Sequence, residues 1–205
     1  MLPGSPDAVR LGLEKIVIPE LGHLAKLTRS SRTIGTAEAT TATATTSATL
    51  THLDARGQAR MVDVGEKAMT TREAVAQAVV TMSADCFALL ASGATKKGDV
   101  LATARIAGIQ ASKKTSELIP LCHPIALSSV SVDLELDATR HAVRVIATTR
   151  TTDRTGVEME ALVAANVAAL TVYDMLKAVD RAITIGDVVL LKKTGGKSGD
   201  YTRAG

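Results

Sequence analysis

The stretch TGVEMEALVAANVAALTVYDMLKAVD, residues 155–180, decides the fold, and it predicts one long helix. Between residues 161 and 172 only Asn166 and Thr171 are polar, so nearly the whole circumference of this helix is apolar. A helix of that kind is buried on most sides, either in a large core or at a subunit interface. We therefore expect the rest of the chain to fold around it.

Charged residues stand at both ends of the predicted helix. Glu158 and Glu160 lie near its start, and Asp174 and Lys177 lie near its end. Asp174 and Lys177 are three residues apart and so share a face. The plain interpretation is a solvated ion pair, which contributes little to stability. The alternative is a general acid and base, provided that burial lowers the pKa of the lysine toward neutral.

The composition limits the kinds of function that the chain can have. The chain has 205 residues, which is enough for one domain with a real core. Hydrophobic residues make up 46% and aromatic residues 1%, so the core must consist of Ala, Val, Leu and Ile. A net charge of +3 suits an anionic small ligand. Without aromatic stacking platforms or a long Lys/Arg run, the composition does not favour nucleic acid as a partner.

Two further features of composition concern location. Cys86 and Cys122 do not suggest a disulfide framework, and reduced thiols in a cytoplasmic protein are the simpler interpretation. No apolar run reaches the roughly 18 residues that a membrane span needs, so we expect no membrane partner.

The first 47 residues differ from the rest. A short helix over residues 5–16 is predicted, with Ser5 as its cap, and residues 36–49 (TAEATTATATTSAT) are of low complexity. Such a segment has almost no large apolar groups to bury. We expect residues 1–47 to be a disordered extension and residues 48–205 to form the functional domain.

The first half of that domain predicts one strand and three helices. Thr70 and Glu73 fit a capping box, and Asp99 can cap a later helix. A short strand or an extended segment is predicted over residues 59–64, and the predicted helices cover residues 70–82, 84–91 and 100–112.

The second half changes to a two-residue period. Pro120 and Pro124 exclude regular helix over residues 118–124 (LIPLCHP). Apolar and polar residues then alternate, which predicts half-buried strands. The predicted strands cover residues 127–136 and 141–149, which form a hairpin, and residues 185–191, which precede a flexible basic loop over residues 192–199. The class is α+β, with helices packed on one face of an antiparallel sheet.

Three loops could hold an anion. The loop with Gly196, Lys197 and Ser198 resembles the end of a P-loop, but Leu191 stands where that motif needs glycine and no helix follows. Its backbone amides and Lys197 could still bind phosphate, and a mobile tail is the alternative. Lys96 and Lys97 precede a predicted helix N-terminus, which favours phosphate, although they could equally be solvated.

The third loop contains Cys122 and His123. Neighbouring residues rarely bind one metal together, and the two partners of a Cys–His nucleophile usually come from distant segments. His123, fixed between prolines, better suits a hydrogen-bond donor to an anionic ligand. A satisfied structural histidine is the other interpretation.

Taken together, these motifs resemble the MoaC family, the cyclic pyranopterin monophosphate synthases of molybdenum cofactor biosynthesis. The resemblance covers about three quarters of the chain and excludes residues 1–47. The matching strings, in order, are MVDV (61–64), KGDV (97–100), ARIAGI (104–109), LIPLCHP (118–124), TGVEMEAL (155–162), YDMLKAV (173–179) and GGKSG (195–199). The departures, Ile125, Leu176 and Thr194, touch no charged site residue.

The resemblance implies a ferredoxin-like subunit in a homohexamer, a trimer of dimers with active sites at the dimer interfaces. It implies a lyase that converts (8S)-3',8-cyclo-7,8-dihydroguanosine 5'-triphosphate to cyclic pyranopterin monophosphate and releases pyrophosphate. Carried over to matching positions, Asp174 is the catalytic acid/base, with Lys177 and Lys97 as its partners. The implied substrate-site residues are Leu121, Cys122, His123, Glu158, Met159 and Glu160, with Lys67, Arg72, Lys113, Lys193 and Lys197 as further phosphate or ring contacts.

No cofactor is required by these motifs, and no dedicated metal site is visible, although Mg²⁺ could accompany the phosphates. An inactive ligand-binding protein of the same fold is the main alternative, and the presence of Asp174, Lys177 and Lys97 argues against it. At a rise of about 1.5 Å per residue, the two charged ends of the long helix lie about 24 Å apart. If both ends contact substrate, they serve it from different subunits or at different sites.

Overall fold

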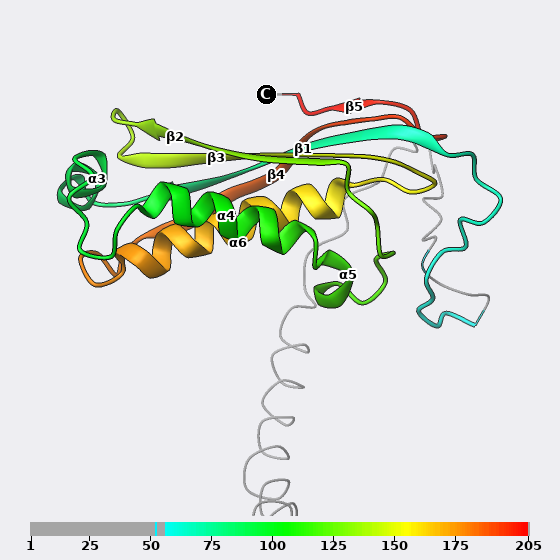
Figure 1. The fold of residues 1–205 in the computed structure, drawn as a ribbon, viewed down its shortest axis with the longest axis horizontal. Coiled ribbons are helices and arrows are strands. Elements are labelled where there is room, and N and C mark those ends of the chain that lie inside the picture. Colours follow the sequence, from blue (N-terminus) through cyan, green and yellow to red (C-terminus); the bar gives the residue numbers. More distant parts are fainter. Residues whose placement is uncertain (1–51, 53–55, 205) are drawn as a thin grey trace, which may run out of the picture. The chain divides into compact units, whose positions relative to one another are not determined.

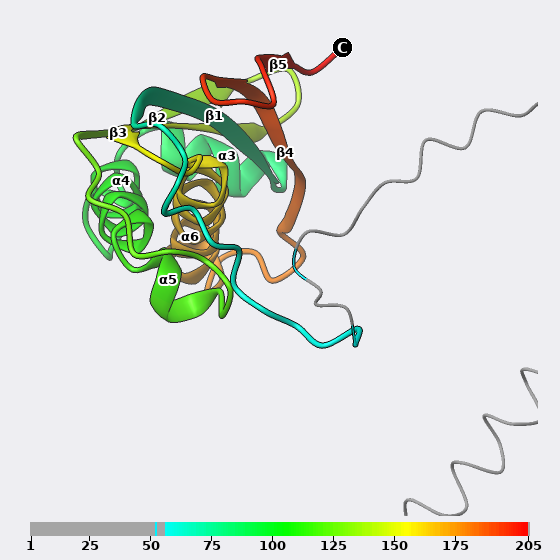
Figure 2. The same ribbon diagram turned by 90° about the vertical axis from the view of Figure 1, so that its right-hand side faces the viewer.

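The structure is a computed structural model that describes residue 52 and residues 56–204. The predicted extension over residues 1–47 lies outside this part of the chain. The described residues form a five-stranded antiparallel sheet in the order β2-β3-β1-β4-β5, with the long helices on one face (Figures 1 and 2). The elements are β1 (Thr70–Thr81), α3 (Ala84–Ala91), α4 (Val100–Ser112), α5 (Thr115–Leu118), β2 (Ser129–Asp137), β3 (Ala142–Asp153), α6 (Glu158–Leu176), β4 (Thr184–Thr194) and β5 (Tyr201–Thr202).

The framework of the fold is the series β1, α4, β2, β3, α6 and β4. This is the βαββαβ order of a ferredoxin-like fold, in which each helix crosses over one face of the sheet. The α+β class with helices on one face of an antiparallel sheet is thus confirmed.

The long helix α6 lies at the centre of the helical layer, beside α4 and beneath the sheet (Figure 2). Its small residues allow this close approach: Ala161, Ala164, Ala165, Ala168 and Ala169 are all fully buried. Its length and composition would also allow it to cross a membrane, but half of the relevant stretch is buried in the fold. We therefore interpret α6 as the core helix of a folded domain.

At Gly108 the helices α4 and α6 pack closely together. A Cβ atom there would lie 2.8 Å from the carbonyl oxygen of Ala164 and 3.2 Å from the Cβ of Ala168. The prediction of a closely packed helix over residues 100–112 is confirmed, and Asp99 caps it by accepting a 2.8 Å hydrogen bond from the Ala102 amide.

The predicted helix over residues 70–82 is wrong, because this segment is the strand β1. Its residues alternate in burial, with Ala74, Ala76, Ala78 and Val80 facing the helices. Alanine favours helix in isolation. Here β1 pairs with β3 on one side and β4 on the other, and these neighbours override the local preference.

Other boundaries differ in smaller ways. Residues 59–64, predicted as a short strand or an extended segment, form no strand apart from an isolated bridge at Ala59. The short helix α5 and the short strand β5 were not predicted. The predicted hairpin is confirmed, although β3 runs on to Asp153, and the basic loop forms a turn that joins β4 to β5.

Candidate functional site

The first turn of α6 opens into a cavity of about 270 Å³, which we call the acid cavity. The loop that follows α5 forms one wall, and the irregular segment before β1 forms another. The structure brings together here seven residues that the resemblance implies: Lys67, Leu121, Cys122, His123, Glu158, Met159 and Glu160.

Glu160 is the buried acid of this cavity. Its side chain is only 3% exposed. Burial, together with the nearby charge of Glu158, raises the pKa of Glu160 to about 7. A carboxyl group with that pKa is present in both protonation states at neutral pH, as general acid–base catalysis requires.

Burial also raises the pKa of the Cys122 thiol, and the charge of Glu160 adds to this effect. A raised pKa keeps the thiol protonated, which disfavours Cys122 as a nucleophile. Cys122 therefore serves as a wall of the cavity rather than as a reacting group.

His123 is fixed by the backbone. Its Nε2 atom lies 2.8 Å from the carbonyl oxygen of Val62. Because a carbonyl oxygen can only accept, Nε2 carries the proton, and neutral His123 keeps Nδ1 as an acceptor. The structural interpretation of His123 is thus supported, because the side chain anchors the segment before β1. Donation from His123 to an anionic ligand stays a prediction.

A second cavity of about 330 Å³ adjoins the first, which we call the cationic cavity. The two share Lys67, Thr155, Gly156 and Glu158. Its basic side chains come from four separate segments of the chain, and they are Lys67, Arg72, Arg154, Lys193 and Lys197. Such a concentration of positive charge suits the phosphate groups of a nucleotide.

Glu158 stands between the two cavities. Its Oε1 atom lies 3.7 Å from Nζ of Lys193, and the same ammonium group donates a 2.6 Å hydrogen bond to Ser198 Oγ. Two residues of the glycine-rich turn (residues 195–199), Lys197 and Ser198, line the cationic cavity. The prediction that Lys197 and neighbouring backbone could hold phosphate is consistent with this position.

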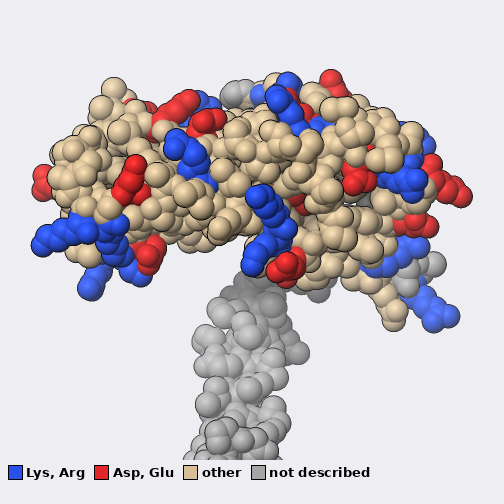
Figure 3. Space-filling model, in the orientation of Figure 1, with Lys and Arg blue, Asp and Glu red and all other residues tan. Residues whose placement is uncertain are grey.

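The opposite end of α6 carries a separate cluster. Nζ of Lys177 lies 2.6 Å from Oδ1 of Asp174, and Nζ of Lys97 lies 3.7 Å from Oδ2. Figure 3 shows Lys and Arg side chains gathered at this end of the helical layer, at lower left. Glu160 and Asp174 are about 21 Å apart along the helix axis. Within one subunit, the acid cavity and the Asp174 cluster are therefore far apart.

The cluster at the end of α6 is exposed in the single chain. The hydrogen bond from Lys177 and the charges of both lysines lower the pKa of Asp174. Asp174 in turn raises the pKa of Lys177. The side chains of Asp174, Lys177 and Lys97 are about half exposed or more. In the single chain, burial therefore does not lower the pKa of Lys177 toward neutral, as a general acid and base pair would require.

Two predicted contacts lie elsewhere. Lys97 does not leave the α4 N-terminus open to phosphate, because Asp99 caps that terminus and Nζ of Lys97 reaches Asp174 instead. Lys113 follows α4 as its C-cap residue and lines neither of the two cavities among the residues that the structure describes.

Sequence reasoning missed several wall residues. Arg154 is the most basic of these, and it stands directly before the TGVEMEAL string, which is the signal that could have identified it. The others include His52, Val62 and Val64 in the acid cavity. The valines carry no chemical signal in the sequence, since only the fold places them.

Comparisons of the sequence with known proteins identify the family of this chain. The model of the MoaC family matches residues 61–196, a span that contains both cavities except His52, Lys197 and Ser198. The chain is 60% identical over 152 residues to a cyclic pyranopterin monophosphate synthase from Herpetosiphon aurantiacus. That alignment covers 74% of this chain and 93% of the relative. The chain belongs to the MoaC family.

Proposed function

We propose that the protein is a lyase, a cyclic pyranopterin monophosphate synthase. It converts (8S)-3',8-cyclo-7,8-dihydroguanosine 5'-triphosphate to cyclic pyranopterin monophosphate and releases pyrophosphate, an early step in molybdenum cofactor biosynthesis. Membership of the MoaC family and the printed name of the 60% identical relative support this activity. The observation that carries it is the pair of joined cavities, one with a buried acid and one strongly basic.

The joined cavities match the two parts of such a substrate. The acid cavity offers a titrating carboxyl group at Glu160 and a hydrogen-bond acceptor at His123 Nδ1, which suit the nitrogens and oxygens of a purine-derived ring. The cationic cavity offers ammonium and guanidinium groups for the triphosphate. We place the ring in the first and the outer phosphates in the second, with Glu158 and Lys67 at the boundary.

The reaction opens one ring and closes another, and so it requires proton transfers at several atoms. We propose Asp174 as the acid/base, with Lys177 and Lys97 as its partners. Their mutual contacts hold Asp174 ionised and Lys177 protonated, which are the correct starting forms for a base and an acid. A substrate that excludes water from this cluster would bring the lysine pKa down toward neutral.

One subunit cannot bring both ends of α6 to one substrate, so we propose that the active site is shared. The helical layer exposes apolar side chains along its outer surface, including Ile106 of α4 and Leu170 of α6, which are 58% and 55% exposed. A two-fold contact between two such faces, with α6 antiparallel to its copy, would place Asp174 of one subunit near the acid cavity of the other. Three dimers of this kind would form the homohexamer.

We propose no resident cofactor, and we expect Mg²⁺ to arrive on the phosphates if it takes part. Among the residues that the structure describes, no three His, Cys, Asp or Glu side chains form a group able to hold a metal ion. We also propose a cytoplasmic location, because Cys86 and Cys122 are both free thiols, as a reducing compartment allows.

The proposed activity is tested with the purified protein and the cyclic dihydroguanosine triphosphate. We expect pyrophosphate and cyclic pyranopterin monophosphate to accumulate in equal amounts. Binding of the substrate without either product would instead identify an inactive binding protein of the same fold, and no binding at all would reject the assignment.

A further inference from the structure

Arg72 of β1 is a buried cation without a carboxylate partner among the described residues. Arg72 is only 9% exposed. Its Nε donates to the carbonyl oxygen of Asp153 at 3.4 Å, and its Nη2 donates to that of Arg154 at 3.2 Å. A buried charge without a counter-ion is costly. This cost is offset when an anion occupies the cavity that the side chain lines.

The same guanidinium group supports the glycine-rich turn. Gly195 and Gly196 both have φ of +85°, a conformation that glycine adopts without strain. A Cβ atom on Gly196 would overlap Nη1 of Arg72, so the backbone of the turn packs directly against this end of the guanidinium group. Only glycine allows the backbone to come so close.

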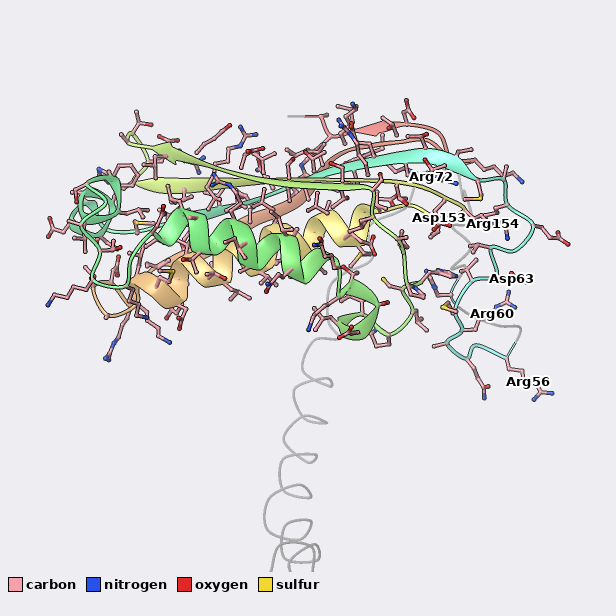
Figure 4. All side chains as sticks on the ribbon, in the orientation of Figure 1. Arg56, Arg60, Asp63, Arg72, Asp153 and Arg154 are labelled. Carbon is pink, nitrogen blue, oxygen red and sulfur yellow. The ribbon has the colours of Figure 1, made fainter. Side chains whose placement is uncertain are left out.

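Arg72 therefore touches two of the segments that build the cationic cavity. One is the end of β3, where Asp153 and Arg154 lead into α6, and the other is the turn that carries Lys197 and Ser198. Figure 4 shows Arg72, Asp153 and Arg154 together at one end of the sheet. Arg72 thus lies between the segments that carry two other basic side chains, Arg154 and Lys197.

We propose that Arg72 is a positioning residue for the departing pyrophosphate, because it holds the Arg154 segment and the Gly195–Gly196 turn in place around a pyrophosphate-binding cationic cavity. This inference rests on the proposed function for the identity of the leaving group. Binding of inorganic pyrophosphate tests it without turnover.

The sharpest test compares two glycines of the same turn. Gly196→Ala adds a methyl group that would displace the Arg72 guanidinium, whereas Gly199→Ala adds one into open space. Both positions have positive φ, +85° and +71°, so the backbone strain is matched. We expect Gly196→Ala to weaken pyrophosphate binding roughly tenfold to a hundredfold, as loss of charge-assisted hydrogen bonds does, and Gly199→Ala to change it less than about threefold. Titration calorimetry measures both.

A second variant applies if Gly196→Ala does not fold. Arg72→Lys keeps the charge but loses the planar fork that reaches two carbonyl groups. We expect it to raise the KM for the substrate roughly tenfold with a smaller change in kcat, since the reacting ring lies in the other cavity. In an Arg154→Ala background the effect of Arg72→Lys on pyrophosphate binding should shrink, because Arg72 acts through Arg154.

Equal pyrophosphate affinity for Gly196→Ala and Gly199→Ala would overturn the inference, and so would independent effects of Arg72→Lys and Arg154→Ala. A wild-type protein that binds no pyrophosphate would overturn it too. These results differ from failure of the proposed function, which shows as no conversion of the cyclic nucleotide by the wild-type protein.

Discussion

Lys97 donates a 2.7 Å hydrogen bond from Nζ to the backbone carbonyl oxygen of Asp174, a residue 77 positions further along the chain. The ammonium group is thus held by the main chain of α6 as well as by the Asp174 carboxylate, which lies 3.7 Å away. Replacing that carboxylate therefore leaves Lys97 with its backbone acceptor. The proposed catalytic role of Asp174 can therefore be tested while the lysine stays in place.

Asp174→Asn is expected to lower kcat by about 10²–10⁴, the usual contribution of one general acid or base. The fold should persist, because the side chain is exposed at the end of α6. Steady-state assay of pyrophosphate release checks this, with circular dichroism as the check on folding. Asp133→Asn, an exposed carboxylate on β2, is the matched control. Undiminished turnover by Asp174→Asn would remove Asp174 from the mechanism.

Glu160 should make stability depend on pH. Its pKa rises from 4.5 to about 7 on folding, so between these values the native state binds a proton that the unfolded state has lost. Stability must therefore fall as the pH rises from about 4.5 to 7, by about 3 kcal/mol in all. Glu160→Gln should flatten this slope. Urea unfolding of both proteins from pH 5 to 8 measures it, and parallel curves would contradict a raised pKa.

Gly108→Ala sets two effects against each other. Alanine is favoured over glycine in a helix by about 1 kcal/mol. The added methyl group would lie 2.8 Å from the Ala164 carbonyl oxygen, and overpacking of this kind costs about 1–3 kcal/mol. We expect net destabilisation in a thermal melt, whereas Gln110→Ala, on the exposed side of α4, should be neutral or stabilising. A stabilised Gly108→Ala protein would show that α4 and α6 can move apart freely.

Leu170→Glu tests the helical face as the dimer contact. The side chain is 55% exposed in the single chain, so the change should leave the subunit folded. If this face is the interface, a buried charge should dissociate the dimers and abolish turnover. Leu136→Glu, on β2 and 42% exposed, is the control and should keep the wild-type mass. Sedimentation velocity measures the mass of both variants. An unchanged mass for Leu170→Glu would place the interface elsewhere.

The sequence predicted the helical layer well because its signals are local. The nearly unbroken apolar run of α6 and the Asp99 cap of α4 act within a few turns of their own helix. β1 could not be predicted in the same way. Its alanines favour helix locally, and only pairing with β3 and β4, far along the chain, makes them strand.

The same distinction between local signals and long-range contacts applies to the residues of the candidate site. The charged residues of the α6 ends could be identified from their spacing and from the family resemblance. The supporting role of Arg72 could not, because it depends on the carbonyl groups of Asp153 and Arg154, which only the fold brings to Arg72. Likewise, the state of Glu160 follows from burial, which no sequence pattern indicates directly.

The position of the acid cavity and of Asp174 at opposite ends of α6 has a genetic consequence. If the active site is shared as proposed, a subunit with a damaged acid cavity and a subunit with Asp174→Asn should each be inactive alone. In the proposed two-fold dimer, made of one copy of each, one of the two sites would receive both intact halves. Random mixing of the two defective proteins should therefore restore about a quarter of the sites. Intersubunit complementation of this kind would let two loss-of-function alleles support growth when they are expressed together.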